Sequence, residues 1–240
     1  MQCMNNLKQL SLAILTYHDL HNELPTATAP QPPLRIEERL SWLALLLPLL
    51  EEKAAQYNMV AADWTMGWAA ESNTHWTHTS IKTFQCPAGN IPQPRQDWPN
   101  TSYVGIAGIG ADAASLPLED KHCGVFGYER RTTIDDVKDG TSRTFCVLET
   151  ALDNGHWAAG GMATVRSIDP EQQPYIGANC PFGIDHRQPF LGSVHFTRQP
   201  LLTNAALLDG SVRQLDASID PRILEALATI AGKEPIPDEF

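Results

Sequence analysis

Two pairs of histidines are spaced so that each pair could share a metal ion. His18 and His21 lie three residues apart near the end of an apolar-periodic segment, and His75 and His78 repeat that spacing beside Trp76. Residues three apart on a helix face the same side, and imidazoles are common zinc ligands. The structural alternative needs no metal, because His18 can pack beneath a sheet with its ring hydrogen-bonded while His21 is solvated. We favour this alternative and predict no transition-metal site.

A carboxylate and two histidines in a glycine- and proline-rich region could perform general acid–base chemistry. They are Asp185, His186 and His195. A hydrolase of the serine type would also need a nucleophile, but the chain has no G-x-S-x-G motif and Ser193 lacks the second glycine. We interpret Ser193 and Ser211 as polar residues at strand ends, and we predict no catalytic residue.

Two Asp–Gly dipeptides predict turns. At residues 139–142 we expect the aspartate to cap its own backbone, the glycine to adopt positive φ, and the next residues to start a strand. Asp209–Gly210 predicts a tight hairpin. Asp209 could also bind calcium together with Asp216 and Asp220, but these residues lack the close alternate spacing of a calcium loop.

One carboxylate, Glu149, ends the apolar strand segment F-C-V-L-E. A charge in such a strand must face solvent or be paired inside the protein, because burying an unpaired charge is costly. We expect structural pairing with Arg213 or Arg143.

The phrase Gly108–Ile109–Gly110 follows a predicted strand, as in a dinucleotide-binding loop. It lacks the third glycine and the helix that must follow. We therefore predict no cofactor.

Five tryptophans could stack on the apolar faces of sugars. They are Trp64, Trp68, Trp76, Trp98 and Trp157. Exposed coplanar rings around a groove would indicate a binding surface, whereas buried rings would indicate ordinary core.

The composition excludes several classes of protein. The 240 residues carry a net charge of −11, with no run of Lys or Arg, so we expect no nucleic-acid partner. The apolar run at residues 40–50 is too short to span a membrane. The hydrophobic content of 42% is sufficient for a real core, and the length suits a single domain over residues 1–240.

The first secondary-structure elements predicted along the chain are helices. Leu7, Leu10, Ile14 and Leu15 follow helical spacing and predict a helix over residues 4–20 that ends before Pro25. This helix has no good N-cap, and we expect it to continue an upstream part. A second helical segment is predicted over residues 36–57, kinked or broken at Pro48.

A β-rich part follows over residues 101–216, after a loop at residues 58–80. A terminal helix is predicted over residues 220–231, with Pro221 at its first position. This order, with helices first and a β-meander second, predicts an α+β fold. The predicted strands cover residues 101–107, 141–150, 193–196, 205–208 and 211–215.

Several phrases, in order, resemble one family. The opening C-M-N-N-L-K-Q-L, the later F-Q-C-P-A-G and T-S-Y-V-G-I-A-G, the central D-G-T-S-R-T-F-C-V-L-E and the closing L-L-D-G-S-V-R-Q-L-D resemble a bacterial prepilin-like family abundant in planctomycetes, domain of unknown function 1559 (DUF1559). The positions that match its motifs are Cys3, Asn5, Asn6, Leu7, Lys8, Gln9, Pro25, Cys86, Pro87, Asp139, Gly140, Thr141, Ser142, Glu149, His195, Asp209, Gly210, Ser211 and Val212.

The resemblance implies a pilin-like fold, with the N-terminal helix laid on an antiparallel sheet. It also implies a prepilin leader and a transmembrane helix upstream of Met1, an extracytoplasmic location, and other pilin-like subunits as partners. One departure affects the late loop: His195 precedes Asp209 by fourteen residues, a longer spacing than the family's, and the usual glycine pair after the histidine is missing.

The resemblance bears on the five cysteines as well. In an exported domain Cys3 or Cys86, both at family-like positions, could form a disulfide, and Cys123 with Cys180 is a second possibility. Sequence alone does not fix the connectivity, and the structural alternative is buried free thiols in a cytosolic protein.

The leading hypothesis is a non-enzymatic, structural role as a pseudopilin-like domain that assembles or presents a surface. Leu7, Leu10, Ile14 and Leu15 are the predicted packing residues of the helix. The alternative hypothesis is an extracellular module that binds a small solute or carbohydrate. An enzyme, such as a metal-dependent hydrolase, comes third.

Overall fold

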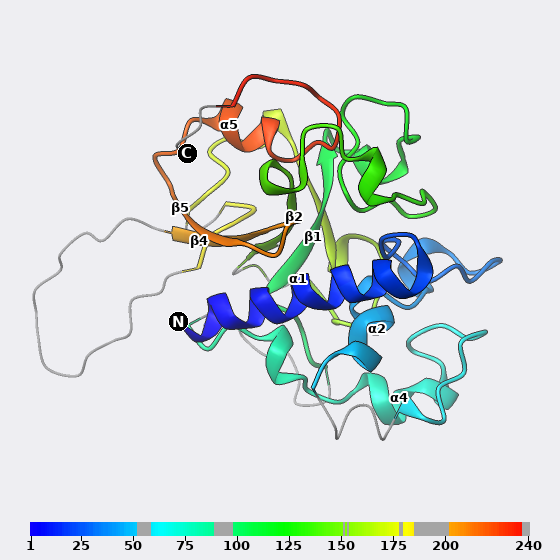
Figure 1. The fold of residues 1–240 in the computed structure, drawn as a ribbon. Coiled ribbons are helices and arrows are strands. Elements are labelled where there is room, and N and C mark those ends of the chain that lie inside the picture. The colour runs from blue at the N-terminus through cyan, green and yellow to red at the C-terminus, as the bar shows by residue number, and fades with distance from the viewer. Residues whose placement is uncertain are drawn as a thin grey trace, which may run out of the picture.

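A long N-terminal helix, α1 (Gln2–His21), lies across a five-stranded sheet and forms the framework of the domain (Figure 1). The structure is a computed structural model that describes residues 1–51, 59–88, 98–150, 152, 154–177, 180–184 and 202–236. Its helix-on-sheet arrangement confirms the predicted α+β fold.

Helix α1 follows from its apolar stripe. Leu7, Leu10 and Ile14 are fully buried, so the 3.6-residue periodicity matches the face that packs on the sheet. The helix ends where Asn22 adopts a left-handed conformation (φ 56°) and donates its N–H to the carbonyl of His18 at 2.7 Å. Among the described residues no helix has the length and hydropathy of a membrane span.

The sheet has the strand order β3-β1-β2-β4-β5. All neighbours are antiparallel except β3, which pairs in parallel with β1 at the edge. The meander prediction missed β3, and the predicted strand at residues 193–196 lies outside the described residues. The strands are β1 (Tyr103–Ile109), β2 (Phe145–Glu149), β3 (Val165–Ile168), β4 (Leu202–Leu207) and β5 (Val212–Asp216).

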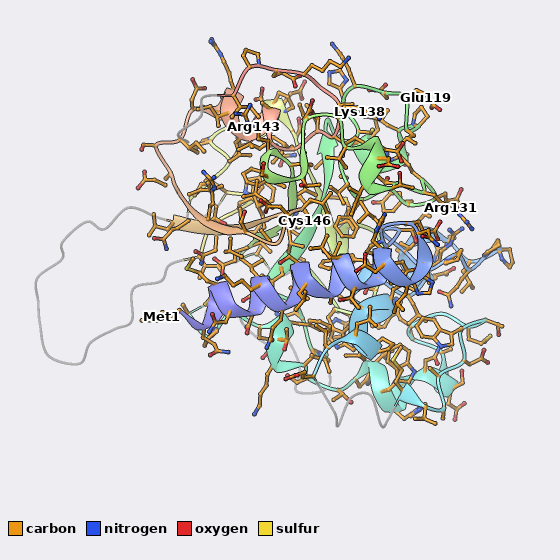
Figure 2. All side chains as sticks on the ribbon, in the orientation of Figure 1. Met1, Glu119, Arg131, Lys138, Arg143 and Cys146 are labelled. Atoms are coloured by element: carbon orange, nitrogen blue, oxygen red, sulfur yellow. A yellow bond between two sulfur atoms is a disulfide. The ribbon has the colours of Figure 1, made fainter. Side chains whose placement is uncertain are left out.

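Both faces of the sheet are buried. The side chains of α1 pack with Val147 on one face, and a second cluster around Phe145 packs on the other face beneath α5 (Pro221–Ala226). Phe145 belongs to the sheet on which Leu7, Leu10 and Ile14 pack, but its side chain lies on the face away from α1. The pairing of β2 with β4 shifts register between Phe145 and Val147, and this irregularity directs Cys146, like Val147, toward α1 (Figure 2).

The helical segment predicted over residues 36–57 forms only as short pieces in its described part, and the α-helical piece ends just before Pro48. The chain forms a 3-10 turn at Ile36–Glu38, the short helix α2 (Trp42–Leu46) and another 3-10 turn at Leu47–Leu49, while residues 52–57 lie outside the described part. The break has a tertiary cause, because Leu40 and Ser41 are extended and form β-bridges with Ala159 and Thr28. Ser41 then caps α2 by accepting the N–H of Ala44 at 3.4 Å.

Two further boundaries differ from the prediction. Helix α4 (Glu71–Thr77) forms inside the segment predicted as a loop. Helix α5 begins at Pro221, as predicted, with Asp220 as its cap, but it ends at Ala226 rather than near residue 231.

The predicted Asp–Gly hairpin is confirmed. Residues of β4 and β5 pair from Leu202 with Asp216 to Ala206 with Val212, and Gly210 in the turn has a φ of +86°. Leu208 lies with Ala206 on the α1 side of the sheet.

Candidate functional site

A disulfide joins the first turn of α1 to the body of the domain. Cys3 and Cys86 are bonded, with Cα atoms 4.9 Å apart, and both are buried. The sequence left the pairing of the cysteines open, and the structure shows that Cys3 pairs with Cys86. The pairing of Cys123 with Cys180 is wrong, because both thiols are free.

The topology separates those two free cysteines. Cys123 forms a bridge with Gly108, near the C-terminal end of β1. The segment after Cys180 instead bridges Thr150, which follows Glu149 and so lies near Tyr103 at the start of β1. The length of the strand therefore lies between the two thiols.

Glu149 is fully buried next to this disulfide. Its carboxylate lies within 4.8 Å of both sulfur atoms, and its Oε2 accepts the backbone N–H of Asn204 at 2.9 Å and the Asn204 side-chain amide at 2.7 Å. Structural pairing was expected, but the partner found here is an asparagine on the neighbouring strand. Arg143 lies near the opposite end of β2, close to α5 (Figure 2), and Arg213 lies on β5, beyond β4.

Two more buried polar side chains complete this group. Asn6 donates its amide to the carbonyl of Gln85 at 2.8 Å, and Tyr103 donates its hydroxyl to the carbonyl of Cys3 at 3.3 Å. Burial, and then the charge of Glu149, raise the pKa of Tyr103 well above its usual range, so the hydroxyl stays neutral. We call Cys3, Asn6, Cys86, Tyr103, Glu149 and Asn204 the disulfide cluster.

The disulfide cluster contains side chains of the types that bind metals, but its cysteines are oxidised and are not thiolates. Within the described residues, only Cys3, Cys86 and Glu149 bring three potential ligand groups within 4.8 Å of one another. Both sulfur atoms are committed to the disulfide, and a thiolate is needed for coordination. In this state the cluster can clamp the helix but cannot coordinate a metal through sulfur.

Eight of the motif positions lie at the two Asp–Gly turns, in residues 139–142 and 209–212. The N–H of Asp209 donates to the carbonyl of Thr141 at 3.1 Å, which places the two turns side by side. Asp139 does not cap its own turn as predicted. Its carboxylate accepts the backbone N–H groups of Gly232 at 2.8 Å and Lys233 at 3.0 Å, and so anchors the segment after α5.

The residues after that aspartate also differ from expectation. Gly140 has the predicted positive φ of 94°, but Thr141–Arg143 forms a 3-10 turn before the strand starts at Phe145. These turns therefore have a structural role, in which two of the family-like phrases support each other.

The calcium alternative is not supported by the geometry. Asp209, Asp216 and Asp220 each accept a backbone N–H two residues further along the chain, at 2.8–2.9 Å. Asp209 and Asp216 lie at opposite ends of the β4–β5 hairpin. Local turn geometry accounts for all three carboxylates.

The histidine pairs are also placed by packing. The Nε2 atom of His18 accepts the N–H of Ile134 at 3.5 Å, and His21 is exposed, with its ring 4.2 Å from that of Tyr17. His75 is exposed, whereas His78 packs against His156. The catalytic candidates Asp185, His186, Ser193 and His195 lie outside the described residues.

The tryptophans divide into core and surface residues. Trp76 and Trp157 are fully buried, Trp68 and Trp98 are half-buried, and Trp64 is 40% exposed. The half-buried rings pack on each other at 5.3 Å in an edge-to-face arrangement. The geometry is thus closer to a closed aromatic cluster than to a row of coplanar exposed rings.

His156 lies inside that cluster. Its ring stacks on Trp68 at 4.5 Å, and its Nδ1 accepts the N–H of Ala158 at 3.0 Å. Burial, with a smaller contribution from His78, lowers the pKa of His156 to about 3. The ring is therefore neutral at physiological pH.

Sequence reasoning missed a pocket at the other end of α1. It lies between Tyr17, Arg39, Tyr128 and Arg131, and its volume is about 240 Å³. These residues come from separate segments and share no motif. The only signal was Arg39, a charged residue directly before the apolar run at residues 40–50.

Comparison with protein-family models identifies the family of the chain. The family model described as protein of unknown function (DUF1559) matches residues 1–222. No curated protein and no solved structure matches the chain.

Proposed function

The chain belongs to the DUF1559 family, and we propose that it is the extracytoplasmic domain of a pseudopilin-like protein with a structural role in assembly or surface presentation. The Cys3–Cys86 disulfide indicates an extracytoplasmic domain, because such bonds persist mainly in oxidising compartments. The pseudopilin role, the upstream membrane anchor and the absence of catalysis are parts of the proposal.

The observation that carries the proposal is the way α1 is mounted. One face of the helix packs on β2, β4 and β5, and the disulfide fixes its first turn. A helix held in this way can transmit a fixed orientation from a neighbouring subunit or an anchor to the whole head domain.

The predicted packing residues are divided by this arrangement. Leu7, Leu10 and Ile14 are fully buried in the domain's own core, and Leu15 is half-buried. On the outward face Leu12 is 64% exposed and Leu20 is 62% exposed. We assign the contact between neighbouring subunits to this outward face, centred on Leu12.

Site-specific cross-linking in cells that make the protein tests the assignment. The Leu12→Cys variant, treated with a short bismaleimide, should give a covalent dimer. The matched control is Glu119→Cys, which places a thiol on an exposed loop away from α1 (Figure 2). Equal dimer yields from both variants, or none from Leu12→Cys, would contradict a role of α1 in assembly.

A further inference from the structure

The pocket at the end of α1 is built from paired charges. Arg39 is only 7% exposed, and it donates its Nε to the carbonyl of Leu34 at 2.8 Å and its Nη1 to Glu129 at 2.9 Å. Arg131 pairs with Glu23 at 3.3 Å, beside the last turn of α1 (Figure 2). The two cations and two anions cancel, so the pocket has no net preference for an anion or a cation.

Two tyrosine rings supply flat apolar surface in the same pocket. Tyr17 is supported by the ring of His21 at 4.2 Å, and Pro30 and Pro32 add a rigid apolar wall. Burial raises the pKa of both Tyr17 and Tyr128, with Glu23 adding to the effect at Tyr17 and Glu37 at Tyr128. Both hydroxyl groups therefore remain neutral, and each can donate and accept a hydrogen bond.

A second cavity of about 350 Å³ adjoins the first. The two share Arg39, Tyr128 and Glu129, so the ion pair stands between them. The second cavity continues toward Ser115 and Arg130. Together they offer two neighbouring subsites rather than one isolated hole.

The wall of the first pocket is preformed. The side chain of Gln31, which is 5% exposed, donates to the carbonyls of Trp64 and Met66 at 2.7 and 2.8 Å, and accepts the N–H of Leu40 at 2.7 Å. These bonds fix the loop that carries Pro30 and Pro32. A ligand then binds without the entropic cost of ordering this loop.

We propose that these two cavities bind neighbouring residues of a neutral oligosaccharide. The apolar face of one sugar ring would lie on Tyr17 or Tyr128, since aromatic rings offer large flat contact area. Adjacent hydroxyl groups would hydrogen-bond to the planar guanidinium and carboxylate groups of the two ion pairs, which present paired donors and acceptors. This binding proposal goes beyond the proposed structural role, because it names the class of molecule that the surface of the domain binds.

A peptide is the competing occupant, and the backbone around the pocket disfavours it. Extended peptides usually bind by adding main-chain hydrogen bonds to a free strand edge. Here the wall segment already uses its backbone groups: Ala27 donates to Gly127 at 2.9 Å, Trp42 donates to Ala27 at 3.1 Å, and Ala29 donates to Leu40 at 2.7 Å.

Binding measurements with the 240-residue chain test the proposal. An array of neutral oligosaccharides identifies the best probe, and calorimetry then compares it with a panel of blocked tripeptides. Tyr128→Ala and Arg131→Gln should each weaken binding of the saccharide by about tenfold or more, which corresponds to about 1.4 kcal/mol. Arg222→Gln is the control, because Arg222 is exposed on α5 and lines neither cavity, and its affinity should be unchanged.

Three results would overturn the proposal. The first is that no saccharide on the array binds. The second is that the saccharide binds Tyr128→Ala and Arg131→Gln as tightly as the parent chain, or loses as much affinity in Arg222→Gln. The third is that only the tripeptides bind. Circular dichroism verifies that Tyr128→Ala is folded, and Tyr17→Ala replaces it if it is not. Cross-linking through Leu12 does not involve the pocket, so failure of one proposal leaves the other standing.

Discussion

Helix α1 meets the rest of the domain in opposite ways at its two ends, marked by Met1 and Arg131 in Figure 2. At the first turn the disulfide cluster is buried, and Asn204 satisfies one oxygen of Glu149. At the last turn the ion pair of Arg131 and Glu23 borders a pocket, and the arginine is 73% exposed.

The difference separates two uses of the same residue types. Buried polar groups with fixed partners hold a structure together, because losing a partner leaves an unsatisfied group away from water. Exposed ion pairs contribute little to stability and remain available to a ligand. We therefore expect changes in the disulfide cluster to lower stability, and changes at the exposed Arg131–Glu23 pair to affect binding.

The largest effect should come from removing the disulfide. The bond links residues 83 apart, so its loss in the Cys3→Ala, Cys86→Ala double variant should lower the free energy of unfolding by about 4–5 kcal/mol. Urea unfolding measures this. Cys180→Ala is the control, because that thiol is free and half-buried, and should change stability by less than about 0.5 kcal/mol. Equal midpoints for the double variant and the parent would show that the clamp has no energetic role.

The next effect concerns Glu149. Glu149→Ala leaves two donors of Asn204 without the acceptor they have now, and should cost about 3 kcal/mol. Glu149→Gln retains one oxygen acceptor of nearly the same shape and should cost clearly less. If alanine is tolerated as well as glutamine, the hydrogen bonds to Asn204 are not what stabilises this end.

A third effect concerns His156, which is buried in the aromatic cluster with Trp68 and should make stability depend on pH. Its folded-state pKa of about 3 lies below the usual 6.5, so below pH 6.5 the unfolded chain binds a proton that the folded chain excludes. The contribution of His156 to the free energy of unfolding is therefore fully present above pH 6.5. Below that pH it falls by about 1.4 kcal/mol for each pH unit down to pH 3, so the loss at pH 5 is about 2 kcal/mol.

The His156→Asn variant isolates this contribution. Asparagine offers an oxygen to the N–H of Ala158 in place of Nδ1 but does not titrate. Denaturant unfolding at several pH values should give a smaller loss of stability for the variant between pH 6.5 and 5. Parallel curves for the two proteins would mean that His156 becomes protonated in the folded state without cost.

A smaller effect is expected at Gly210, which faces the middle of α1. A Cβ atom at this position would lie 3.7 Å from the side chain of Leu15. Gly210 has a φ of +86°, which a β-branched residue resists, so Gly210→Val should destabilise the domain by about 1 kcal/mol or more. Gly210→Asn should lose less, since asparagine tolerates this conformation better. A thermal melt in which Val and Asn behave alike would contradict strain as the cause.

The sequence predicted the parts of the fold that have strong local signals. Helix α1 has a complete apolar stripe, and the β4–β5 hairpin has an Asp–Gly turn. The helical segment predicted over residues 36–57 is interrupted before Trp42, because backbone pairing of Leu40 and Ser41 with distant segments overrides helical periodicity there. Strand β3 was missed because it has four residues, two of them polar, and pairs in parallel with a strand far away in the chain.

The sites were predictable to different degrees for the same reason. Motif resemblance pointed to Cys3, Cys86 and Glu149, but neither the disulfide pairing nor the Asn204 contact follows from spacing, because the partners meet only in the folded sheet. The pocket had no motif at all. Its charged pairs join residues 90 and 108 positions apart, Arg39 with Glu129 and Glu23 with Arg131, and these pairs arise only from tertiary packing.

The smallest expected effect is the sharpest check of the comparison. In Arg131→Gln the ion pair with Glu23 is lost, but the arginine side chain is 73% exposed, so solvent screens the attraction. The free energy of unfolding should change by less than about 0.5 kcal/mol. Urea unfolding at low and high salt measures the change, and the small difference should shrink further at high salt because screening weakens what remains. A loss above about 2 kcal/mol would place Arg131 with the buried, structural polar groups. The two ends of α1 would then not differ in the way proposed, and weaker saccharide binding by this variant would reflect a damaged fold rather than a lost contact.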